Sequence, residues 1–286
     1  MKKLKFVQRN NEGHWVGDGF PVRSIFSYND LAEEMSPFLL LDYGGPAVFP
    51  PTDKRLGVGE HPHRGFETVT IVYDGEVEHR DSAGAGGKIG PGDVQWMTAA
   101  SGLVHEEFHG REFAKRGGTF EMIQLWVNLP RKDKMTTPGY QGLTADLFPN
   151  VALPDDGGTV RVIAGSYGDQ KGPAHTFSPV NLWDVRVNAR KRVEFNVPSG
   201  HTTGIFVLKG KLKLSGGELV GEAELAVLER EGDRFSFEAL EDTKLLFLGG
   251  QPLNEPVVGY GPFVMNTQGE IKQAFVDFQT GKMGRL

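Results

Sequence analysis

Three histidines and one glutamate, in two short runs, are the side chains best suited to chemistry. His61 and His63 occur in EHPHRGFETVT, and His105 and Glu107 occur in SGLVHEEFHG. Each run offers its two groups at positions i and i+2, which a β-strand directs to the same face. Two neighbouring strands would therefore bring three imidazoles and one carboxylate together. That is a complete ligand set for a divalent transition metal, with room left for water or a substrate.

Burial is the physical reason to expect a metal among these four groups. Buried together without an ion, they would leave unpaired polar atoms at a cost of a few kcal/mol each. The membership of the set stays open, because Glu67 and His109 share the strand parity of the groups in their own runs, whereas Glu106 has the opposite parity. Pro62, between two of the histidines, indicates a strand start near a barrel rim that a substrate could reach.

The other histidines favour ordinary structural roles. His14, His175 and His201 each stand apart from other potential ligands, which is typical of surface histidines or of satisfied core histidines. His79 lies in the charged hairpin arm EVEHRDS, where we expect it to be solvated.

The composition is that of a globular protein without thiol chemistry. The chain has 286 residues, enough for about two domains, and no cysteine, which excludes disulfides, thiolate metal sites and a cysteine nucleophile. A formal net charge of −6 with scattered lysines and arginines does not favour direct nucleic-acid binding. No apolar run reaches the ~18 residues of a membrane span, and none follows the basic start MKKLKFVQRN as in a signal peptide. We therefore expect a cytoplasmic protein that does not contact a membrane.

Short strands dominate the pattern that must position the candidate ligands. Segments rich in β-branched and aromatic residues, separated by glycine and proline turns, predict an all-β fold of the barrel or sandwich type. They are 66–73, 94–99, 120–129, 159–165, 180–187, 204–214, 224–229, 234–239 and 243–250. A turn-rich stretch from Pro130 to Gly158 predicts the boundary between two domains, 1–135 with the histidine runs and 136–286 without metal ligands.

One helix is predicted near the C-terminus, over 267–281. Thr267 and Glu270 have the spacing of a capping box, and Gly281 is placed to end the helix. Between them, apolar residues recur at i, i+3, i+4 and i+7, which predicts a structural helix that seals a barrel against solvent. The run 29–36 is also compatible with a short helix.

The two halves of the chain resemble one another. TIVYDGEVE around Gly75 matches FVLKGKLK around Gly210, and PGDVQWM matches EGDRFSF further along, in the same order. Aligning the two glycines places Asn196 and Pro198 where the first half has the two histidines of its HPH motif. This predicts a duplicated barrel with the ligand set in the first copy only.

Longer motifs resemble those of the pirin family of bicupins. They are HPHRGFETVT, RDSAGAGGKIGPGDVQWMTAASGLVHEE, MIQLWVNLP and PLNEPVVGYGPFVMNT, and the match covers nearly the whole chain. The resemblance implies two tandem cupin (jelly-roll) β-barrels, which with the predicted helix complete the fold. It also implies one Fe(II) in the N-terminal barrel, with ligands His61, His63, His105 and Glu107. Glu67 would then orient a histidine ligand. By the Irving–Williams order, Mn, Ni, Cu or Zn could occupy the site in the protein as isolated.

The same resemblance implies a metal-dependent dioxygenase that opens the ring of quercetin-like flavonols with O2. The partners of the metal would be a small aromatic substrate and O2, and Glu107, a ligand able to take up a proton, would act as the general base. An apolar pocket should hold the flat substrate. Residues that could line it are Phe66, Met97, Met122, Leu125 and Trp126.

Two other functions stay open at this point. Some pirin-like proteins are described as iron-dependent, non-catalytic regulators that bind a transcription factor or a metabolic enzyme. In that case the metal would shape a protein-binding surface. A sugar-processing cupin, either an isomerase or an epimerase, is the third hypothesis, and the whole-chain match to pirins disfavours it. Fold alone does not separate the three.

Overall fold

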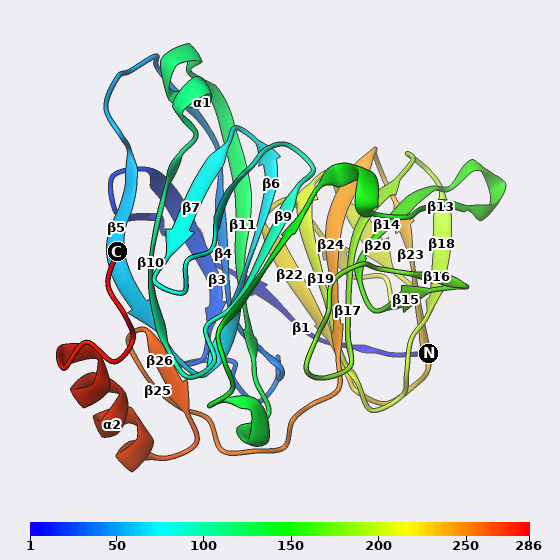
Figure 1. The fold of residues 1–286 in the computed structure, drawn as a ribbon. Helices are drawn as coiled ribbons and strands as arrows, with labels where there is room; N and C mark the ends of the chain where they lie inside the picture. The colour runs from blue at the N-terminus through cyan, green and yellow to red at the C-terminus, as the bar shows by residue number, and fades with distance from the viewer. The chain divides into compact units, whose positions relative to one another are not determined.

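The computed structural model describes residues 1–286, and it confirms the all-β prediction (Figure 1). Each predicted strand segment falls on an observed strand, except that 204–214 forms two strands, Thr202–Lys209 and Leu212–Leu214. By their contacts, the residues form two compact units, here called the first and second barrels. The first consists of Asn11–Ala32, Phe38–Ala145 and Asn254–Leu286, and the second of Met1–Asn10, Glu33–Pro37 and Asp146–Leu253. The predicted domain boundary, between 1–135 and 136–286, stays a prediction.

The first barrel contains two antiparallel sheets, a small hairpin and two α-helices. Its strands are β2 (His14–Val16), β3 (Phe20–Ser27), β4 (Phe38–Phe49), β5 (Gly57–His63), β6 (Phe66–Asp74), β7 (Val77–Asp81), β8 (Gly86–Ile89), β9 (Val94–Thr98), β10 (Leu103–His109), β11 (Gly118–Asn128), β12 (Gly139–Leu143), β25 (Val258–Tyr260) and β26 (Phe263–Met265). Its helices are α1 (Arg111–Arg116), the 3-10 helix η1 (Arg131–Asp133) and α2 (Gln268–Gln279). The seven-stranded sheet has the order β12-β9-β6-β11-β4-β3-β2, and the four-stranded sheet the order β5-β10-β7-β8.

The second barrel repeats this plan. Its strands are β1 (Leu4–Arg9), β13 (Asn150–Leu153), β14 (Gly158–Ala164), β15 (Ser166–Tyr167), β16 (Gln170–Lys171), β17 (Val180–Val187), β18 (Arg192–Asn196), β19 (Thr202–Lys209), β20 (Leu212–Leu214), β21 (Leu219–Val220), β22 (Glu224–Leu228), β23 (Arg234–Ala239) and β24 (Thr243–Gly250). Two more 3-10 helices, η2 (Ala145–Leu147) and η3 (Pro154–Asp156), precede its first hairpin strands or lie between them. Its sheets have the orders β1-β22-β19-β24-β17-β14-β13 and β18-β23-β20-β21.

The strand orders confirm the duplication. The order β5-β10-β7-β8 matches β18-β23-β20-β21, and β9-β6-β11-β4 matches β22-β19-β24-β17. The predicted equivalence of Gly75 and Gly210 is confirmed, since each follows the corresponding strand, β6 or β19, with a φ near +90° that favours glycine. The second predicted match is wrong. PGDVQWM opens β9, the counterpart of β22, whereas EGDRFSF opens β23, the counterpart of β10. Similar Gly-Asp turns precede both strands, and these turns made the two sequences look equivalent.

The terminal segments are exchanged between the two halves of the sequence. The N-terminal strand β1, blue in Figure 1, pairs with β22 of the second barrel. There it takes the edge position that β12 takes beside β9 in the first barrel. The C-terminal residues Asn254–Leu286, with β25, β26 and α2, belong to the first barrel.

Burial on both faces characterises the central strands of the seven-stranded sheet. β6 reads FETVTIVYD, and every residue except the last is buried. β-Branched and aromatic side chains favour such strands. The polar residues among them, Glu67, Thr68 and Thr70, must therefore find partners inside the protein or leave buried polar atoms unpaired.

Helix α2 confirms the predicted C-terminal helix. Its N-cap is Thr267, whose hydroxyl accepts from the Glu270 backbone N–H at 3.2 Å, as the capping-box spacing predicts. Ile271 and Ala274 pack against Val104 of β10, so the helix covers the first barrel. The run 29–36 forms turns, so a helix there is wrong. Conversely, α1 was not predicted, because six residues between two glycines are too few for a helical period to show.

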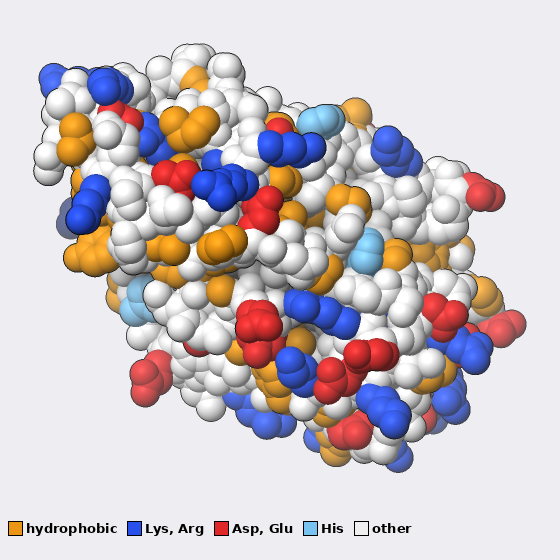
Figure 2. All heavy atoms as spheres, turned by 90° about the horizontal axis from the view of Figure 1, so that it is seen from below, with side chains coloured by type: hydrophobic (Ala, Val, Ile, Leu, Met, Phe, Trp, Pro, Cys, Tyr) orange, Lys and Arg blue, Asp and Glu red, His pale blue; other side chains and the backbone are white.

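The surface charges bear on the expectation about nucleic acid, and the helices bear on the expectation about membranes. On the face shown in Figure 2, basic and acidic side chains are interspersed rather than gathered by sign. The fold has no helix of the length and apolarity that crossing a bilayer requires.

A buried ion pair links α2 to the turn after β5, and its removal should destabilise the fold. Arg64 donates through Nη1 to Asp277 Oδ2 at 3.0 Å and through Nε to the Ser101 carbonyl at 2.6 Å. We expect Asp277→Ala to lower the free energy of unfolding by about 3 kcal/mol, because a buried guanidinium loses its counter-charge. Urea denaturation measures this.

A matched control is Glu112→Ala, which removes an exposed pair with Lys115 in the same barrel. It should cost less than ~1 kcal/mol. Equal effects of Asp277→Ala and Glu112→Ala would contradict a structural role for the buried pair.

Candidate metal centre

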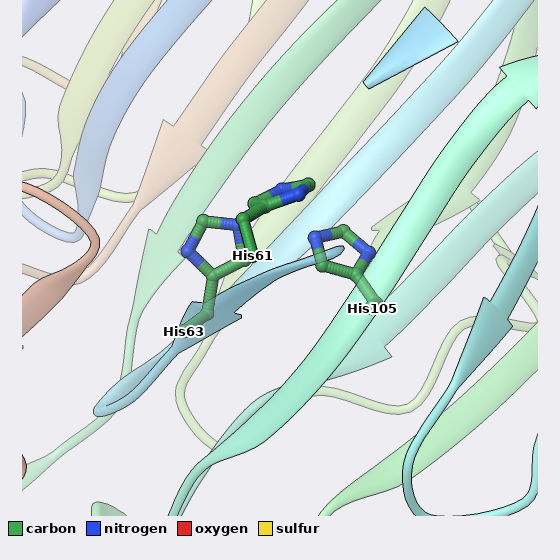
Figure 3. Close-up of side chains that lie close together, drawn as sticks. All are labelled: His61, His63 and His105. Carbon is green, nitrogen blue, oxygen red and sulfur yellow. The ribbon is translucent and has the colours of Figure 1, made fainter. Parts of the chain in front are cut away.

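Two adjacent strands bring three histidines together. β5 and β10 pair antiparallel, with His61 directly opposite His105, and His63 lies two residues further along β5. Figure 3 shows the three rings turned toward one another. Their centroids lie 4.2 Å apart for His61 and His105, and 4.9 Å apart for the two pairs that include His63. One ring nitrogen of each lies within 4.8 Å of the other two, so the structure has a group of side chains that could hold a metal ion.

Backbone carbonyls orient the two histidines of β5. Nδ1 of His61 lies 2.8 Å from the Gly59 carbonyl oxygen, and Nδ1 of His63 lies 3.4 Å from that of Pro262. Because a carbonyl oxygen only accepts, each Nδ1 must be the protonated nitrogen. Each Nε2 then has a free lone pair, which is what a ligand needs.

The third histidine supplies the test of whether a cation fits. His105 Nε2 is buried and has no hydrogen-bond partner in the protein. Burial, together with the neighbouring imidazoles, holds the pKa values of His105 and His63 well below their ordinary value. These rings are therefore neutral, the form that binds metals. Two neutral imidazoles beside His61, with an unpaired nitrogen on His105, fit a divalent transition metal.

Glu107 adjoins the triad through His105. The Glu107 carboxylate forms a second candidate group with His79 and His105, in which all three potential ligand atoms lie within 4.8 Å of one another. Gln95 Nε2 donates to Glu107 Oε1 at 3.0 Å. The Thr70 hydroxyl lies 3.4 Å from the same oxygen, and its single proton is donated to the nearer Gln124 Oε1 at 2.9 Å. A register shift of β10 between His105 and Glu107 accompanies this arrangement. The four-residue ligand set expected from the sequence stays a prediction.

The expectation that His79 is solvated is wrong. His79 and Asp81 are both buried, and His79 Nε2 lies 3.1 Å from Asp81 Oδ2. The ring of His79 also stacks on Tyr140, with centroids 5.1 Å apart. β7 alternates buried and exposed residues, with Val77, His79 and Asp81 inside. That period of two was the available signal in VEHRD, and the flanking charges obscured it.

Two of the other residues considered from the sequence lie outside the triad. Glu106 points away as its parity predicts, and it pairs with Arg55 at 2.9 Å and Arg80 at 2.6 Å. His109 is buried, with Nε2 2.8 Å from the Gly19 carbonyl oxygen. Its ring contacts phenylalanines and none of the triad histidines, and we assign it to the hydrophobic core.

Glu67 lies on the face of β6 opposite to the one that carries Thr68 and Thr70, and it makes its hydrogen bond there. Alternate residues of a strand face opposite sides, so Glu67 is directed away from Thr68 and Thr70. Its Oε1 accepts from the Thr98 hydroxyl at 2.8 Å. Burial raises the pKa of Glu67 to about 7. Its expected role in orienting a histidine ligand stays a prediction.

A cavity of about 310 Å³ opens beside the triad. Its lining residues are Val16, Phe20, Val22, Asp42, Val58, His61, His63, Glu107, Met122, Gln124 and Trp126. Met122 and Trp126 line it as expected, whereas Phe66, Met97 and Leu125 are buried outside its wall. Phe66 lies behind Trp126, the two rings stacking with centroids 4.3 Å apart. The volume and the mainly apolar wall are those of a small-molecule site.

In the second barrel, aromatic rings occupy the equivalent strands. β18 and β23 correspond to β5 and β10, and their paired residues Phe195 and Phe235 stack with centroids 5.1 Å apart. Phe247 and Trp183 extend this stack within the same core.

Two family models match the chain. The model described as Pirin matches residues 19–127, and the model described as Pirin C-terminal cupin domain matches residues 182–284. Together they cover more than half of the chain, and each falls on one half of the duplicated sequence.

Individual relatives match over nearly the whole length. A protein of Pseudomonas aeruginosa named "Putative quercetin 2,3-dioxygenase" is 59% identical over 100% of this chain and 99% of its own. A "Pirin-like protein" of Caulobacter vibrioides is 38% identical, with 98% of each chain covered. A crystal structure titled quercetin 2,3-dioxygenase from Acinetobacter baumannii has 56% identity and a TM-score of 0.97, with 99% of each chain covered.

The triad predicts one metal ion per chain. His105→Ala should abolish stoichiometric binding of Zn(II), because it removes the ligand whose nitrogen lacks any other partner. His201→Ala, in the second barrel, should leave binding unchanged. Calorimetric titration of chelator-treated protein measures both. A stoichiometry near two, or wild-type binding by His105→Ala, would contradict this assignment.

The raised pKa of Glu67 predicts a pH-dependent stability difference. Since folding favours the protonated carboxyl, the cost of burying Glu67 is absent below pH ~4.5, grows as the pH rises from there to about 7, and is constant above that. In metal-free protein, Glu67→Gln should therefore gain stability over the wild type from pH 5 to pH 8. The gain should reach up to about 3 kcal/mol, since each pKa unit corresponds to about 1.4 kcal/mol. A difference in unfolding free energy that does not change with pH would show that Glu67 is ionised throughout.

Proposed function

This chain belongs to the pirin family, and from that premise we propose that it is a metal-dependent dioxygenase that opens the ring of quercetin-like flavonols with O2. The observation that carries the proposal is the position of the imidazole triad, with His61 and His63 in the wall of a cavity large enough for a small aromatic molecule. The names of the relatives from P. aeruginosa and A. baumannii support the choice of substrate.

The proposed ligands are His61, His63, His105 and Glu107. Fe(II) is the metal we propose, and Mn, Ni, Cu or Zn could replace it in isolated protein because N and O ligands discriminate weakly among these ions. A redox-capable metal held there would supply a place where a deprotonated flavonol hydroxyl and O2 can meet.

Glu107 is the proposed general base. The Gln95 amide donates to its Oε1 at 3.0 Å, so the carboxylate can take up the proton of the flavonol hydroxyl on Oε2 without losing that bond. Tyr140 holds the amide in this orientation by donating to Gln95 Oε1 at 3.3 Å. Burial and the nearby charges of Glu107 and Asp81 raise the pKa of Tyr140 to about 12, so it stays a donor.

The cavity offers a second polar region at a distance that suits a flavonol. In the seven-stranded sheet, Asp42 lies opposite Gln124, and Gln124 lies opposite Thr70. Two strand spacings separate Asp42 from Thr70, which is about 10 Å. Thr70 contacts Glu107 and donates to Gln124, so Asp42 is the polar group that could bind a hydroxyl on the part of the substrate remote from the ligands. Phe20, Met122 and Trp126 supply apolar walls of the same cavity.

Turnover of quercetin under air tests the proposal. Chelator-treated protein is reloaded anaerobically with Fe(II), and loss of flavonol absorbance is measured together with O2 uptake. We expect equimolar consumption that requires both metal and His105. Protein that binds the metal but shows no turnover with Fe(II), Mn(II) or Cu(II) would overturn the dioxygenase proposal and favour the non-catalytic regulator.

Substitution of Glu107 should separate metal binding from proton transfer. Glu107→Gln keeps the size and one ligating oxygen but loses the basicity. Metal affinity should fall modestly, and turnover should fall by the ~10²–10⁴ that a general base contributes. Both are measured on the same Fe(II)-loaded preparations.

The matched control is Glu106→Gln, the same change in the next residue, which pairs with arginines outside the cavity. It should keep wild-type turnover. If Glu107→Gln is fully metallated and oxidises quercetin at the wild-type rate, Glu107 is not the base.

A further inference from the structure

A line of buried side chains leads away from the triad behind His105. On β7, Asp81 lies opposite His105, and His79 lies opposite Glu107. Asp81 Oδ2 is 3.1 Å from His79 Nε2, and His79 Nδ1 is 3.3 Å from His105 Nδ1. The side chains of His79 and Asp81 are 0% and 1% exposed, so water does not compete for these contacts. The proposed ligand set and general base include neither residue.

Two neighbours determine which nitrogen of His79 holds the proton. The Asp81 carboxylate only accepts hydrogen bonds, so His79 Nε2 must donate to it. On the other side of the ring, the Gln95 amide nitrogen, which only donates, lies 3.5 Å from His79 Nδ1. The same nitrogen donates to Glu107, which fixes its identity as the amide NH2. Asp81 therefore requires a proton on His79 Nε2, and the Gln95 donor requires a lone pair on Nδ1.

The tautomer of His105 follows from that of His79. Two nitrogens 3.3 Å apart form a hydrogen bond only if one donates. Since His79 Nδ1 has the lone pair, His105 Nδ1 must be protonated. The lone pair of His105 is then on Nε2, the buried atom without a hydrogen-bond partner.

We propose that His79 and Asp81 are positioning residues that hold His105 in the tautomer able to bind a metal through Nε2. This inference rests on the proposed role of His105 as a metal ligand. His61 and His63 are oriented by backbone carbonyls, which substitution does not remove. The orientation of His105 depends on side chains, and it can therefore be altered without changing the ligands themselves.

Asp81→Asn is the discriminating variant because the two oxygens of Asp81 have different partners. Oδ1 accepts from the backbone N–H groups of Ala83 and Ala85, at 2.9 and 3.1 Å. An asparagine must keep its oxygen there, so its NH2 group faces His79 Nε2. His79 would then have to protonate on Nδ1, and two N–H groups would oppose each other between His79 and His105.

Chelator competition with Zn(II) as the probe measures the consequence. We expect Asp81→Asn to bind Zn(II) 10–100-fold more weakly than the wild type, the usual effect of losing a partner behind a ligand. The control is Asp30→Asn, which removes the same charge from a turn where one oxygen also accepts backbone N–H groups, those of Ser27 and Leu31. It should bind as the wild type does. If Asp81 serves only to accept the backbone N–H groups of its turn, Asp81→Asn will bind Zn(II) with wild-type affinity, and the proposal is overturned.

A second measurement needs no variant. Nitrogen-15 spectra of histidine-labelled, metal-free wild-type protein distinguish the two imidazole tautomers. The proposal expects His79 protonated on Nε2 and His105 on Nδ1, and the opposite assignment for His79 overturns it. Failure of the wild-type protein to bind Zn(II) would instead contradict the proposed metal site, while these spectra would still decide the tautomers.

Discussion

The unpaired Nε2 of His105 is the constraint on which the rest of the first barrel depends. A buried polar atom without a partner costs about 1–3 kcal/mol, and a metal ion bound by this nitrogen would remove that cost. β5 places two further imidazoles beside it, β7 supports it from behind, and the C-terminal segment contributes the Pro262 carbonyl that orients His63. These elements come from distant parts of the sequence. That they converge on one position is the strongest argument that a metal ion binds there.

The second barrel shows what the same topology does without that constraint. Its sheets repeat the strand order of the first, yet its equivalent strands present phenyl rings that stack and fill the interior. Such a core is stabilised by the burial of apolar surface. The two barrels differ in chemistry through a few inward-facing positions, while the strand order of the sheets stays the same.

Local periodicity made much of this predictable. The strands are short, apolar and bounded by turns, and the HPH and HEE motifs show the period of two that directs side chains to one face. The capping box of α2 is a local signal too. The failures concern information that is not local. The pairing of β1 with β22 depends on residues more than two hundred positions apart, and the burial of His79 depends on β10 and Tyr140. No pattern within one strand records the pairing of β1 with β22, and the flanking charges of VEHRD obscured the alternation that places His79 inside.

Anomalous diffraction from crystals of the Zn(II)-loaded protein tests the central claim most directly. Two overlapping groups of side chains could hold an ion, one made of His61, His63 and His105, and one made of His79, His105 and Glu107. Our account predicts one peak per chain, within about 2.0–2.2 Å of the Nε2 atoms of His61, His63 and His105 and of a Glu107 oxygen. His79 should not ligate. A peak bound through His79, or one in the second barrel, would contradict the account.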